Sequence, residues 1–289
     1  METLRTADGL TLHLRHWPCP AARGRVLIVH GLGEHIGRYD AVARSLQSQG
    51  WSVSGYDQRG HGRSEGARGT IPADDSLCSD LATVVDALRG SGHGSAGSGA
   101  KRLVLLGHSM GGVVAARFAA EALSKRPAAW SRKVDALVLS SPALDPGMNA
   151  LQKLLLAVLG RLAPGLAVNN GLRPEWISRD AAVVRSYVQD PLVHDRVSAR
   201  LVRFIVDAGL RVQSRAARWR LPTLLLWAGA DRCVAPAGSA GFAAVAPISW
   251  VQAQVFPALF HEIFNEPERA EVLARLGDWL AAVVERDWV

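Results

Sequence analysis

Six short apolar runs, separated by segments of helical periodicity, constrain the fold of this chain more than any other feature. The runs are in general continuously apolar rather than alternating, which is typical of strands covered by helices on both faces. The runs span residues 25–30, 51–57, 102–106, 134–140, 222–227 and 250–256. Helices are expected over residues 38–49, 74–89, 110–123 and 267–284. We therefore predict an α/β fold with a mostly parallel central sheet and helices on both of its faces.

Two shorter segments have patterns of their own. Alternating polarity over residues 3–6 and 10–16, joined at Asp8-Gly9, predicts a hairpin at the start of the sheet. Residues 90–99 are almost entirely Gly, Ser and Ala, which favours a flexible surface loop.

The largest break in the pattern is the region of residues 145–220, which contains no convincing strand. Apolar residues recur there at helical spacing from Leu151 to Leu162, and Pro164 ends that helix. We predict that this region forms a helical cap, inserted after the sixth strand. The α/β core then comprises the rest of the chain, residues 1–144 and 221–289.

The composition favours an apolar core over a charged binding surface. Hydrophobic residues make up 48% of the 289 residues, far more than a disordered chain carries. The net charge is +7, from 33 basic against 26 acidic residues, but the basic residues are dispersed and only four of them are lysines. Because nucleic-acid binding needs clustered positive charge, we predict no nucleic-acid partner.

The sequence carries no sign of secretion or of a structural metal. Cys19, Cys78 and Cys233 fit neither a disulfide framework nor a zinc site. The first residues lack the continuous apolar stretch of a secretory signal, and the longest apolar stretch, residues 154–159, is far shorter than the roughly 20 residues of a membrane span. We expect a cytoplasmic protein without metal or cofactor, whose contact with membranes is at most peripheral.

A G-x-S-x-G sequence, Gly107-His108-Ser109-Met110-Gly111, lies between a predicted strand and a predicted helix. In that context the turn presents the serine hydroxyl at the carboxyl edge of the sheet and at a helix N-terminus. A serine in an ordinary glycine-rich turn is the simpler interpretation of the five residues alone. The strand and helix on either side favour a nucleophile.

A serine nucleophile needs a base within hydrogen-bonding reach and an acid that orients the base. In this class of fold both follow the serine in the chain, the acid first. Asp231 and His261 each follow one of the last two strand runs, so we expect them at the same sheet edge as Ser109. The only other histidine after the serine is His194, in the predicted cap. The alternatives to Asp231 are aspartates that do not directly follow a late strand: Asp135, Asp145, Asp180, Asp190 and Asp195.

The backbone N–H groups of Leu32 and Met110 are the expected donors to a tetrahedral oxyanion. Met110 follows the nucleophile, and Leu32 lies in the loop after the third strand, the two positions that supply this hole in the fold. The same loop, from Gly31 to Gly37, approaches a dinucleotide fingerprint but is one residue too long. Since only Asp57 could take the ribose role, we predict no dinucleotide cofactor.

Taken together, the motifs resemble the monoacylglycerol lipase and lysophospholipase group of serine α/β-hydrolases. The resemblance covers most of the chain, through HGLGEH with Arg38-Tyr39, DQRGHGRSEG, GHSMGG, Ser141-Pro142, DPL at 190–192, GAD at 229–231 and His261-Glu262. It implies hydrolysis of a single-chain lipid ester: Ser109 attacks the acyl carbonyl, His261 transfers the proton and Asp231 holds the imidazole. Monoacylglycerols are the implied substrates, and glycerol and fatty acid the products.

The resemblance also places Glu34 and Arg38 near the pocket for the polar head group. A surface ion pair that caps the following helix is the alternative for these two residues. The helical stripe that begins at Leu151 likewise has two interpretations. It is either a face buried on the sheet domain, or a face that lines an acyl tunnel or contacts a lipid interface.

Other functions are compatible with the same residues. A lysophospholipase, or a broad-specificity esterase or thioesterase, would use the same triad. A non-catalytic member of the fold that binds a small hydrophobic ligand is the alternative from another class, and a peptidase is less favoured because no pocket for a free amine is evident. The sequence leaves open the acyl chain length, the head group, the regiospecificity and the oligomeric state.

Overall fold

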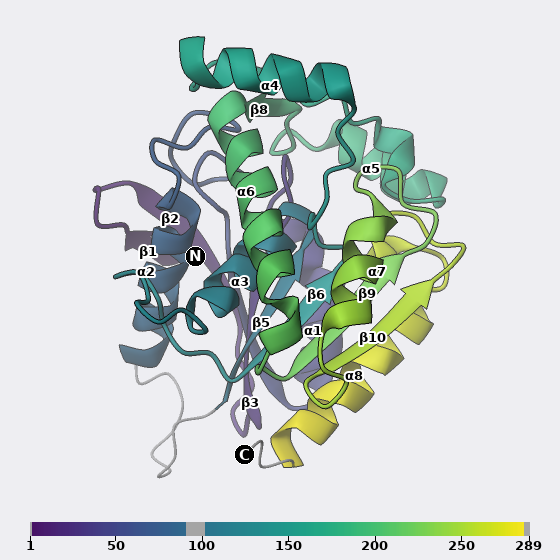
Figure 1. The fold of residues 1–289 in the computed structure, drawn as a ribbon. Coiled ribbons are helices and arrows are strands. Elements are labelled where there is room, and N and C mark those ends of the chain that lie inside the picture. The colour runs from purple at the N-terminus through teal and green to yellow at the C-terminus, as the bar shows by residue number, and fades with distance from the viewer. Residues whose placement is uncertain (1, 91–101, 286–289) are drawn as a thin grey trace.

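The computed structural model describes residues 2–90 and 102–285, and the glycine-rich loop predicted over 90–99 lies outside them except for Gly90. Within these residues eight strands form one sheet in the order β1-β2-β4-β3-β5-β6-β9-β10 (Figure 1). The first two pairings are antiparallel and all others are parallel, which confirms the mostly parallel sheet. The strands are Glu2–Arg5 (β1), Thr11–Trp17 (β2), Gly24–Val29 (β3), Trp51–Tyr56 (β4), Leu103–His108 (β5), Ala136–Ser140 (β6), Thr223–Ala228 (β9) and Val251–Phe256 (β10).

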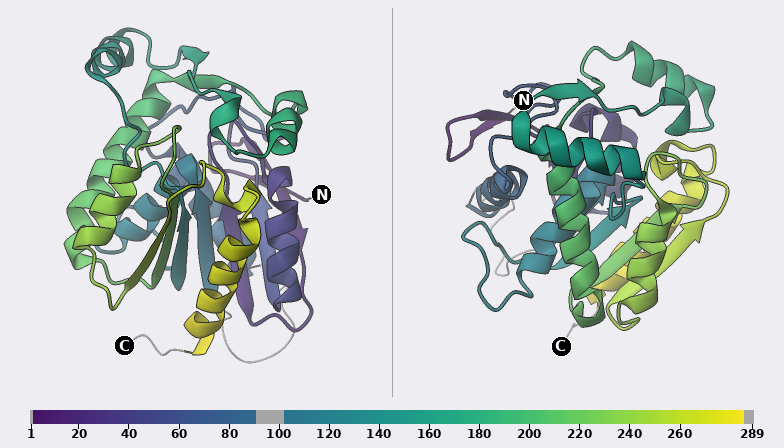
Figure 2. Two further views of the ribbon diagram at one scale, coloured as in Figure 1. Left: turned by 90° about the vertical axis from the view of Figure 1, so that its right-hand side faces the viewer. Right: turned by 45° about the horizontal axis from the view of Figure 1, so that its top comes forward.

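Helices cover both faces of this sheet, as the side view shows (Figure 2). One face carries α2, α3, α6 and α7, and the other carries α1 and α8. The helices are Asp40–Ser48 (α1), Ser76–Gly90 (α2), Ser109–Glu121 (α3), Ala199–Arg215 (α6), Pro236–Val245 (α7) and Arg269–Glu285 (α8). Short 3-10 turns span Ile36–Tyr39 (η1), Ala216–Arg218 (η3) and Ile263–Asn265 (η4).

The continuous apolar runs of the inner strands β3, β5 and β6 are explained by burial on both faces of the strand. Successive side chains of a strand point to opposite faces. In β3, Leu27 and Val29 join the core beneath α2 and α3, whereas Val26 and Ile28 join the core beneath α1 and α8. Both faces of β3 are therefore apolar, and its sequence does not alternate between polar and apolar residues.

The parallel register brings several chain segments to one edge of the sheet. Gly107 of β5 pairs with Val29 of β3, and Phe256 of β10 pairs with Ala228 of β9. The segments that follow these strands therefore leave the sheet on the same side. This edge is where open α/β sheets bind ligands.

The cap lies above this edge. Its elements are Ala150–Leu162 (α4), Ala167–Asn169 (β7), Pro174–Trp176 (η2), Ala181–Gln189 (α5) and Arg196–Ser198 (β8). The expectation of no strand in residues 145–220 is wrong, because β7 and β8 pair antiparallel. Each has only three residues, too few for a period-two pattern to appear.

Helix α6 falls within the range predicted for the cap but packs as a core helix. Its buried residues, Leu201, Phe204, Ile205, Ala208 and Val212, belong to the main hydrophobic core. We therefore propose that the cap consists of residues 145–198, with α6 counted among the helices of the core.

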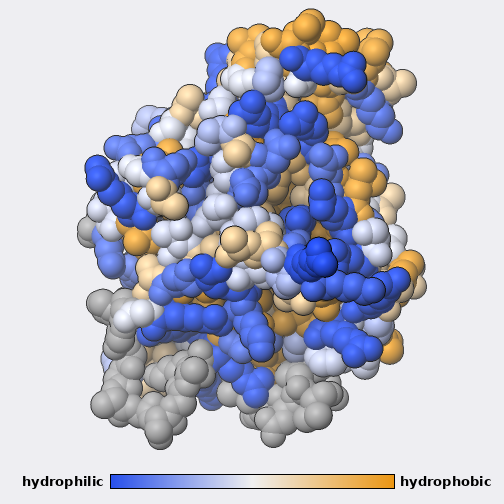
Figure 3. All heavy atoms as spheres, turned by 60° about the vertical axis from the view of Figure 1, so that its left-hand side comes forward, coloured by the Kyte–Doolittle hydropathy of each residue, from blue (hydrophilic) through white to orange (hydrophobic). Residues whose placement is uncertain are grey.

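Helix α4 buries none of its side chains. Leu151, Leu154 and Leu162 are 63%, 61% and 80% exposed, so the interpretation of α4 as a helix with one face buried on the sheet domain is wrong. The helix lies across the top of the molecule, where apolar residues gather on the surface (Figures 1 and 3). None of the helices in the described part of the chain combines the length and the apolarity needed to cross a bilayer.

Candidate active site

Ser109 occupies the sharp turn between β5 and α3. Its backbone φ is 54°, in the left-handed region that a non-glycine residue rarely adopts. The turn requires glycine two residues to either side: a Cβ on Gly107 would lie 2.5 Å from the carbonyl oxygen of Gly111. The serine is partly exposed, while the strand before it is fully buried. The strained turn thus presents the hydroxyl at the sheet edge.

His261 and Asp231 form a buried pair at the same edge. Nδ1 of His261 lies 2.7 Å from Oδ2 of Asp231. The other carboxylate oxygen accepts the backbone N–H groups of Cys233 and Val234, at 2.8 and 3.1 Å. Since Nδ1 faces the carboxylate, Nε2 is the ring nitrogen left to accept a proton.

Burial and the ion pair act in opposite directions on these two groups. Burial disfavours the charged imidazole, but the charge and hydrogen bond of Asp231 hold the pKa of His261 above its usual value. Burial also disfavours the carboxylate, and His261 together with two backbone N–H groups holds the pKa of Asp231 below its usual value. The pair therefore favours an ionised Asp231 and a basic His261.

His108 packs against the imidazole of His261, with ring centroids 4.7 Å apart. Burial and the neighbouring His261 lower the pKa of His108 to about 4, so its ring is neutral near pH 7. Its Nδ1 lies 3.1 Å from the hydroxyl of Ser140. A neutral ring gives His261 an uncharged neighbour, which does not oppose protonation of the His261 imidazole.

The two predicted oxyanion donors come from two different segments near Ser109. Met110 is in the first turn of α3, where backbone N–H groups have no partner within the helix. Leu32 follows β3, and in the described part of the chain its N–H makes no hydrogen bond. A Cβ on Gly31, beside Leu32, would lie 3.2 Å from the Cβ of Ser109, so this loop passes close to the serine.

Glu34 and Arg38 form a buried ion pair rather than a surface one. Arg38 donates to Glu34 at 2.9 Å, and its second terminal nitrogen donates to Glu262 at 2.7 Å. Glu34 also accepts from the Tyr39 hydroxyl and the Gly31 N–H, at 2.7 and 2.6 Å. Burial opposes ionisation of Glu34, but Arg38 holds its pKa near 2. The alternative of a surface pair is therefore wrong, because both side chains are almost fully covered.

A cavity of about 400 Å³ joins these groups beneath the cap. Of the residues predicted from the sequence, Ser109, His261, Leu32 and Glu34 line it. Three others lie behind this lining: Asp231 bonds to His261, Arg38 bonds to Glu34, and Met110 sits in the helix turn. The lining residues that the sequence analysis did not propose as contacts include His108, Arg173, Tyr187, Asp190, His194, Cys233 and Glu262. Most belong to the cap, whose sequence offered no local signal beyond the DPL motif at residues 190–192.

One cluster of potential metal ligands occurs in the described residues, formed by Asp231, Cys233 and His261. Two of these already bond to each other. Burial and the charge of Asp231 raise the pKa of Cys233, which keeps it a thiol, whereas metals bind the thiolate. The donor chemistry therefore fits a His–Asp pair beside a neutral thiol better than a metal centre.

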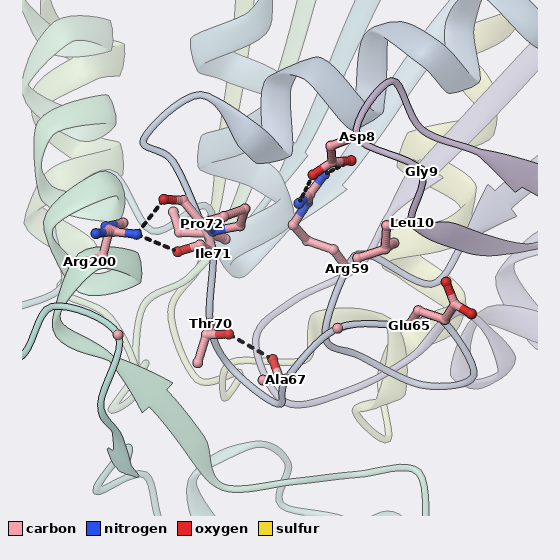
Figure 4. Close-up of a pocket in the computed structure, with 12 residues that line it drawn as sticks. Asp8, Gly9, Leu10, Arg59, Glu65, Ala67, Thr70, Ile71, Pro72 and Arg200 are labelled. Atoms are coloured by element: carbon pink, nitrogen blue, oxygen red, sulfur yellow. Dashed lines mark hydrogen bonds and ion pairs between the residues drawn. The ribbon is translucent and has the colours of Figure 1, made fainter.

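A larger cavity, of about 610 Å³, lies beside the β1–β2 turn (Figure 4). Its charged groups are bonded within the protein: Arg59 binds Asp8 at 2.9 Å, and Arg200 of α6 donates to the carbonyls of Ile71 and Pro72. No histidine or cysteine lines it. It therefore lacks a nucleophile paired with a base, in contrast to the cavity at Ser109.

Comparison with known proteins is consistent with this geometry. A family model described as serine aminopeptidase, S33 (Hydrolase_4), matches residues 20–268. A monoacylglycerol lipase from Mycolicibacterium smegmatis is 35% identical over 265 residues, which cover 90% of this chain and 89% of the relative. A monoglyceride lipase from Rattus norvegicus is 29% identical, over 96% of this chain and 89% of its own length. A solved structure of the monoacylglycerol lipase of Paleococcus ferrophilus superposes with a TM-score of 0.81 at 33% identity, covering 94% of this chain and 99% of the other.

Proposed function

Since the chain belongs to the family described as serine aminopeptidase, S33, and to the monoacylglycerol lipase group of serine α/β-hydrolases, we propose that it cleaves monoacylglycerols to fatty acid and glycerol. It is a serine ester hydrolase. The observation that carries the proposed reaction is a single cavity lined by Ser109 on its strained turn and by His261 bonded to Asp231.

In the first half of the proposed reaction, Oγ of Ser109 attacks the acyl carbonyl carbon while Nε2 of His261 takes the hydroxyl proton. Asp231 holds the ring and stabilises the imidazolium that forms. The N–H groups of Leu32 and Met110 donate to the oxyanion of the tetrahedral intermediate. When the intermediate collapses, the bond to the alcohol oxygen breaks, and His261 returns its proton to the departing glycerol.

In the second half, water replaces the alcohol. His261 takes a proton from the water as its oxygen bonds to the acyl carbon of the acyl-serine. Collapse of the second tetrahedral intermediate breaks the bond to Oγ, and the proton passes from His261 back to Ser109. The fatty acid leaves and the free enzyme is restored.

The charges around the cavity favour an ester of a neutral alcohol over a peptide with a free amine. A buried ammonium group is costly unless an opposite charge pairs with it. The carboxylates that line the cavity already have basic neighbours: Glu34 and Glu262 bind Arg38, Asp190 binds His35, and Asp195 binds Arg196. In our proposal Glu34 contacts the hydroxyl groups of the alcohol, and Arg38 holds Glu34 in place.

The acyl chain is proposed to extend beneath α4. A cavity of about 1020 Å³ lies between α4, α6 and α7, with Leu144, Leu156, Val206 and Leu210 in its lining. This cavity begins close to Ser109. Ala143, which precedes the lining residue Leu144, donates its N–H to the backbone carbonyl of Ser109 at 2.9 Å. The exposed leucines of α4 are proposed to contact the lipid surface from which the substrate enters.

A head-group series tests the substrate. Hydrolysis of monoacylglycerols with acyl chains of 8 to 18 carbons is compared with that of lysophosphatidylcholines carrying the same chains. We expect a higher kcat/KM for the monoacylglycerols at every length, since a neutral alcohol needs no charged partner in the cavity. Faster hydrolysis of the lysophospholipids would contradict the proposal and favour a lysophospholipase.

A further inference from the structure

The backbone around His261 is held on both sides by bonds that do not involve the catalytic groups. The residue before it, Phe260, donates its N–H to the carboxylate of Glu266 at 3.0 Å. The residue after it, Glu262, donates its N–H to the carbonyl of Ile177 in the cap at 2.8 Å. The loop of His261 is therefore fixed partly by its own chain and partly by the cap.

Glu266 joins these two attachments. Its carboxylate is completely buried and also accepts the Ser178 hydroxyl, the Arg179 N–H and the Arg179 Nε, at 2.7, 2.6 and 2.6 Å. With Phe260, four donors converge on the two oxygens, three from the cap and one from the loop of His261. Glu266 does not line the cavity at Ser109, so its side chain does not contact the substrate.

The chemistry of this cluster favours a fixed geometry. Burial alone would raise the pKa of Glu266, but Arg179 and the backbone N–H groups hold the pKa below its usual value. An ionised carboxylate with only donors around it accepts stronger hydrogen bonds than a neutral group would. All four donors are directional, so moving the cap segment or the histidine loop would leave a buried charge without its full set of partners.

We propose that Glu266 is a positioning residue, which ties the loop of His261 to cap residues 177–179 and so keeps the imidazole in register between Asp231 and Ser109. The proposal rests on the proposed catalytic roles of these three residues. A displacement of about 1 Å at such a base is expected to cost up to roughly a hundredfold in turnover.

Glu266→Gln tests this, with Glu268→Gln as the matched control. Glu268 binds the same Arg179 but is half exposed, and it accepts no hydrogen bond from Phe260 or Ser178, both of which donate to Glu266. Glutamine at 266 keeps the size of the side chain, yet its amide nitrogen would face a donor. We expect kcat per active site to fall roughly tenfold to a hundredfold in Glu266→Gln and to be unchanged in Glu268→Gln, with KM for a short-chain ester little altered in both.

Two measurements separate positioning from loss of folded protein. Titration of active sites with a fluorophosphonate counts the competent molecules, so kcat refers to these alone. The acid limb of the pH profile of kcat/KM reports the pKa of His261, which the charge of Asp231 raises. If the ring moves away from Asp231, this limb shifts to lower pH, by roughly half a unit or more. A purely structural role would lower the titrated fraction but leave both kcat per site and the acid limb in place.

Glu266→Asp provides a second variant that keeps the charge if the glutamine variant does not fold. Its carboxylate is one methylene shorter and cannot reach both the cap and Phe260, so we expect a smaller loss in the same direction. Equal kcat per site and equal acid limbs in the 266 and 268 variants would overturn the positioning role. Full activity in Ser109→Ala would instead overturn the proposed function, and the two failures are thereby distinguished.

Discussion

The two parts of the cap are held to the molecule in opposite ways. Residues 170–198, here called the anchored segment, are attached by buried and partly buried polar contacts, among them Ser178 to Glu266 at 2.7 Å and Asp190 to His35 at 2.8 Å. Helix α4 has no buried side chain and exposes its leucines at the top of the molecule (Figure 3). Directional hydrogen bonds hold the anchored segment in one position, whereas the exposed apolar face of α4 allows that helix several positions.

This difference in attachment corresponds to the cavity that each part of the cap borders. The anchored segment contributes Tyr187, Asp190 and His194 to the cavity at Ser109, where a defined geometry is needed. Helix α4 borders the larger cavity that we assign to the acyl chain, whose length and bending vary. We infer that the anchored segment serves the chemistry and that α4 serves the encounter with lipid. The predictions below separate these two roles.

The largest effect is expected from Ser109→Ala, which should remove the chemistry and leave the lipid contact intact. Turnover of a short-chain ester should fall roughly a thousandfold or more, because nucleophile and base act as a unit. Partitioning onto phosphatidylcholine vesicles, measured by sedimentation, should not change. In the unsubstituted protein, a fluorophosphonate should label Ser109 alone when the modified peptides are mapped by mass.

Ser48→Ala is the control for this change, since Ser48 is an exposed serine at the end of α1. It should retain full turnover and full labelling. Residual activity in Ser109→Ala close to that of the unsubstituted enzyme would refute the proposed nucleophile. Labelling at several serines, or at none, would favour a protein that binds hydrophobic ligands without catalysis.

A smaller effect is expected from a charge on α4, which should weaken the lipid contact and leave the chemistry intact. Leu155→Glu should lower vesicle partitioning roughly tenfold, since it removes an apolar group that gains from burial in lipid and adds a charge that resists it. Hydrolysis of a soluble short-chain ester should be unchanged. Activity on long-chain monoacylglycerols in vesicles should fall together with the partitioning.

Ile248→Glu is the matched control, because Ile248 is 91% exposed in the segment between α7 and β10, away from the cap. If general surface hydrophobicity drives partitioning, both variants will lose it equally, and the special role of α4 is refuted. If Leu155→Glu slows hydrolysis of the soluble ester as strongly as that of the vesicle substrate, the two parts of the cap are not separate in function.

The core of this fold could be predicted from the sequence because its signals are local. Runs buried on both faces identified the strands of the parallel sheet, and the turn at Ser109 was recognisable because it demands glycines at fixed spacing. Asp231 and His261 followed from strand order alone, and the structure brings them to 2.7 Å from each other.

The cap could not be predicted to the same depth, because its contacts join residues far apart in the chain. Glu266 and Ser178 are 88 residues apart, and nothing in either local sequence indicates the other. The helical stripe of α4 showed a helix but could not show what covers it, since an apolar face is the same in sequence whether it meets a core or a lipid. The strands β7 and β8 were too short to leave a pattern.

The smallest effect, and the most direct test of the different attachment, comes from removing a helix cap in each of two adjoining helices. Asn149 caps α4 by accepting the Gln152 N–H at 2.9 Å, and Ser198 caps α6 by accepting the Leu201 N–H at 3.3 Å. Each replacement by alanine costs its helix about 1 kcal/mol. Because α6 is part of the core, Ser198→Ala should lower Tm by roughly 2–4 °C.

Asn149→Ala should leave Tm nearly unchanged, because α4 can fray without exposing any buried side chain. The loss of helix stability in Asn149→Ala should appear instead as faster amide hydrogen exchange confined to residues 150–162. Calorimetry and exchange measured by mass spectrometry report the two quantities on the same samples. An equal loss of Tm in both variants would mean that α4 unfolds together with the core, and the contrast between a fixed and an adaptable part of the cap would then have to be given up.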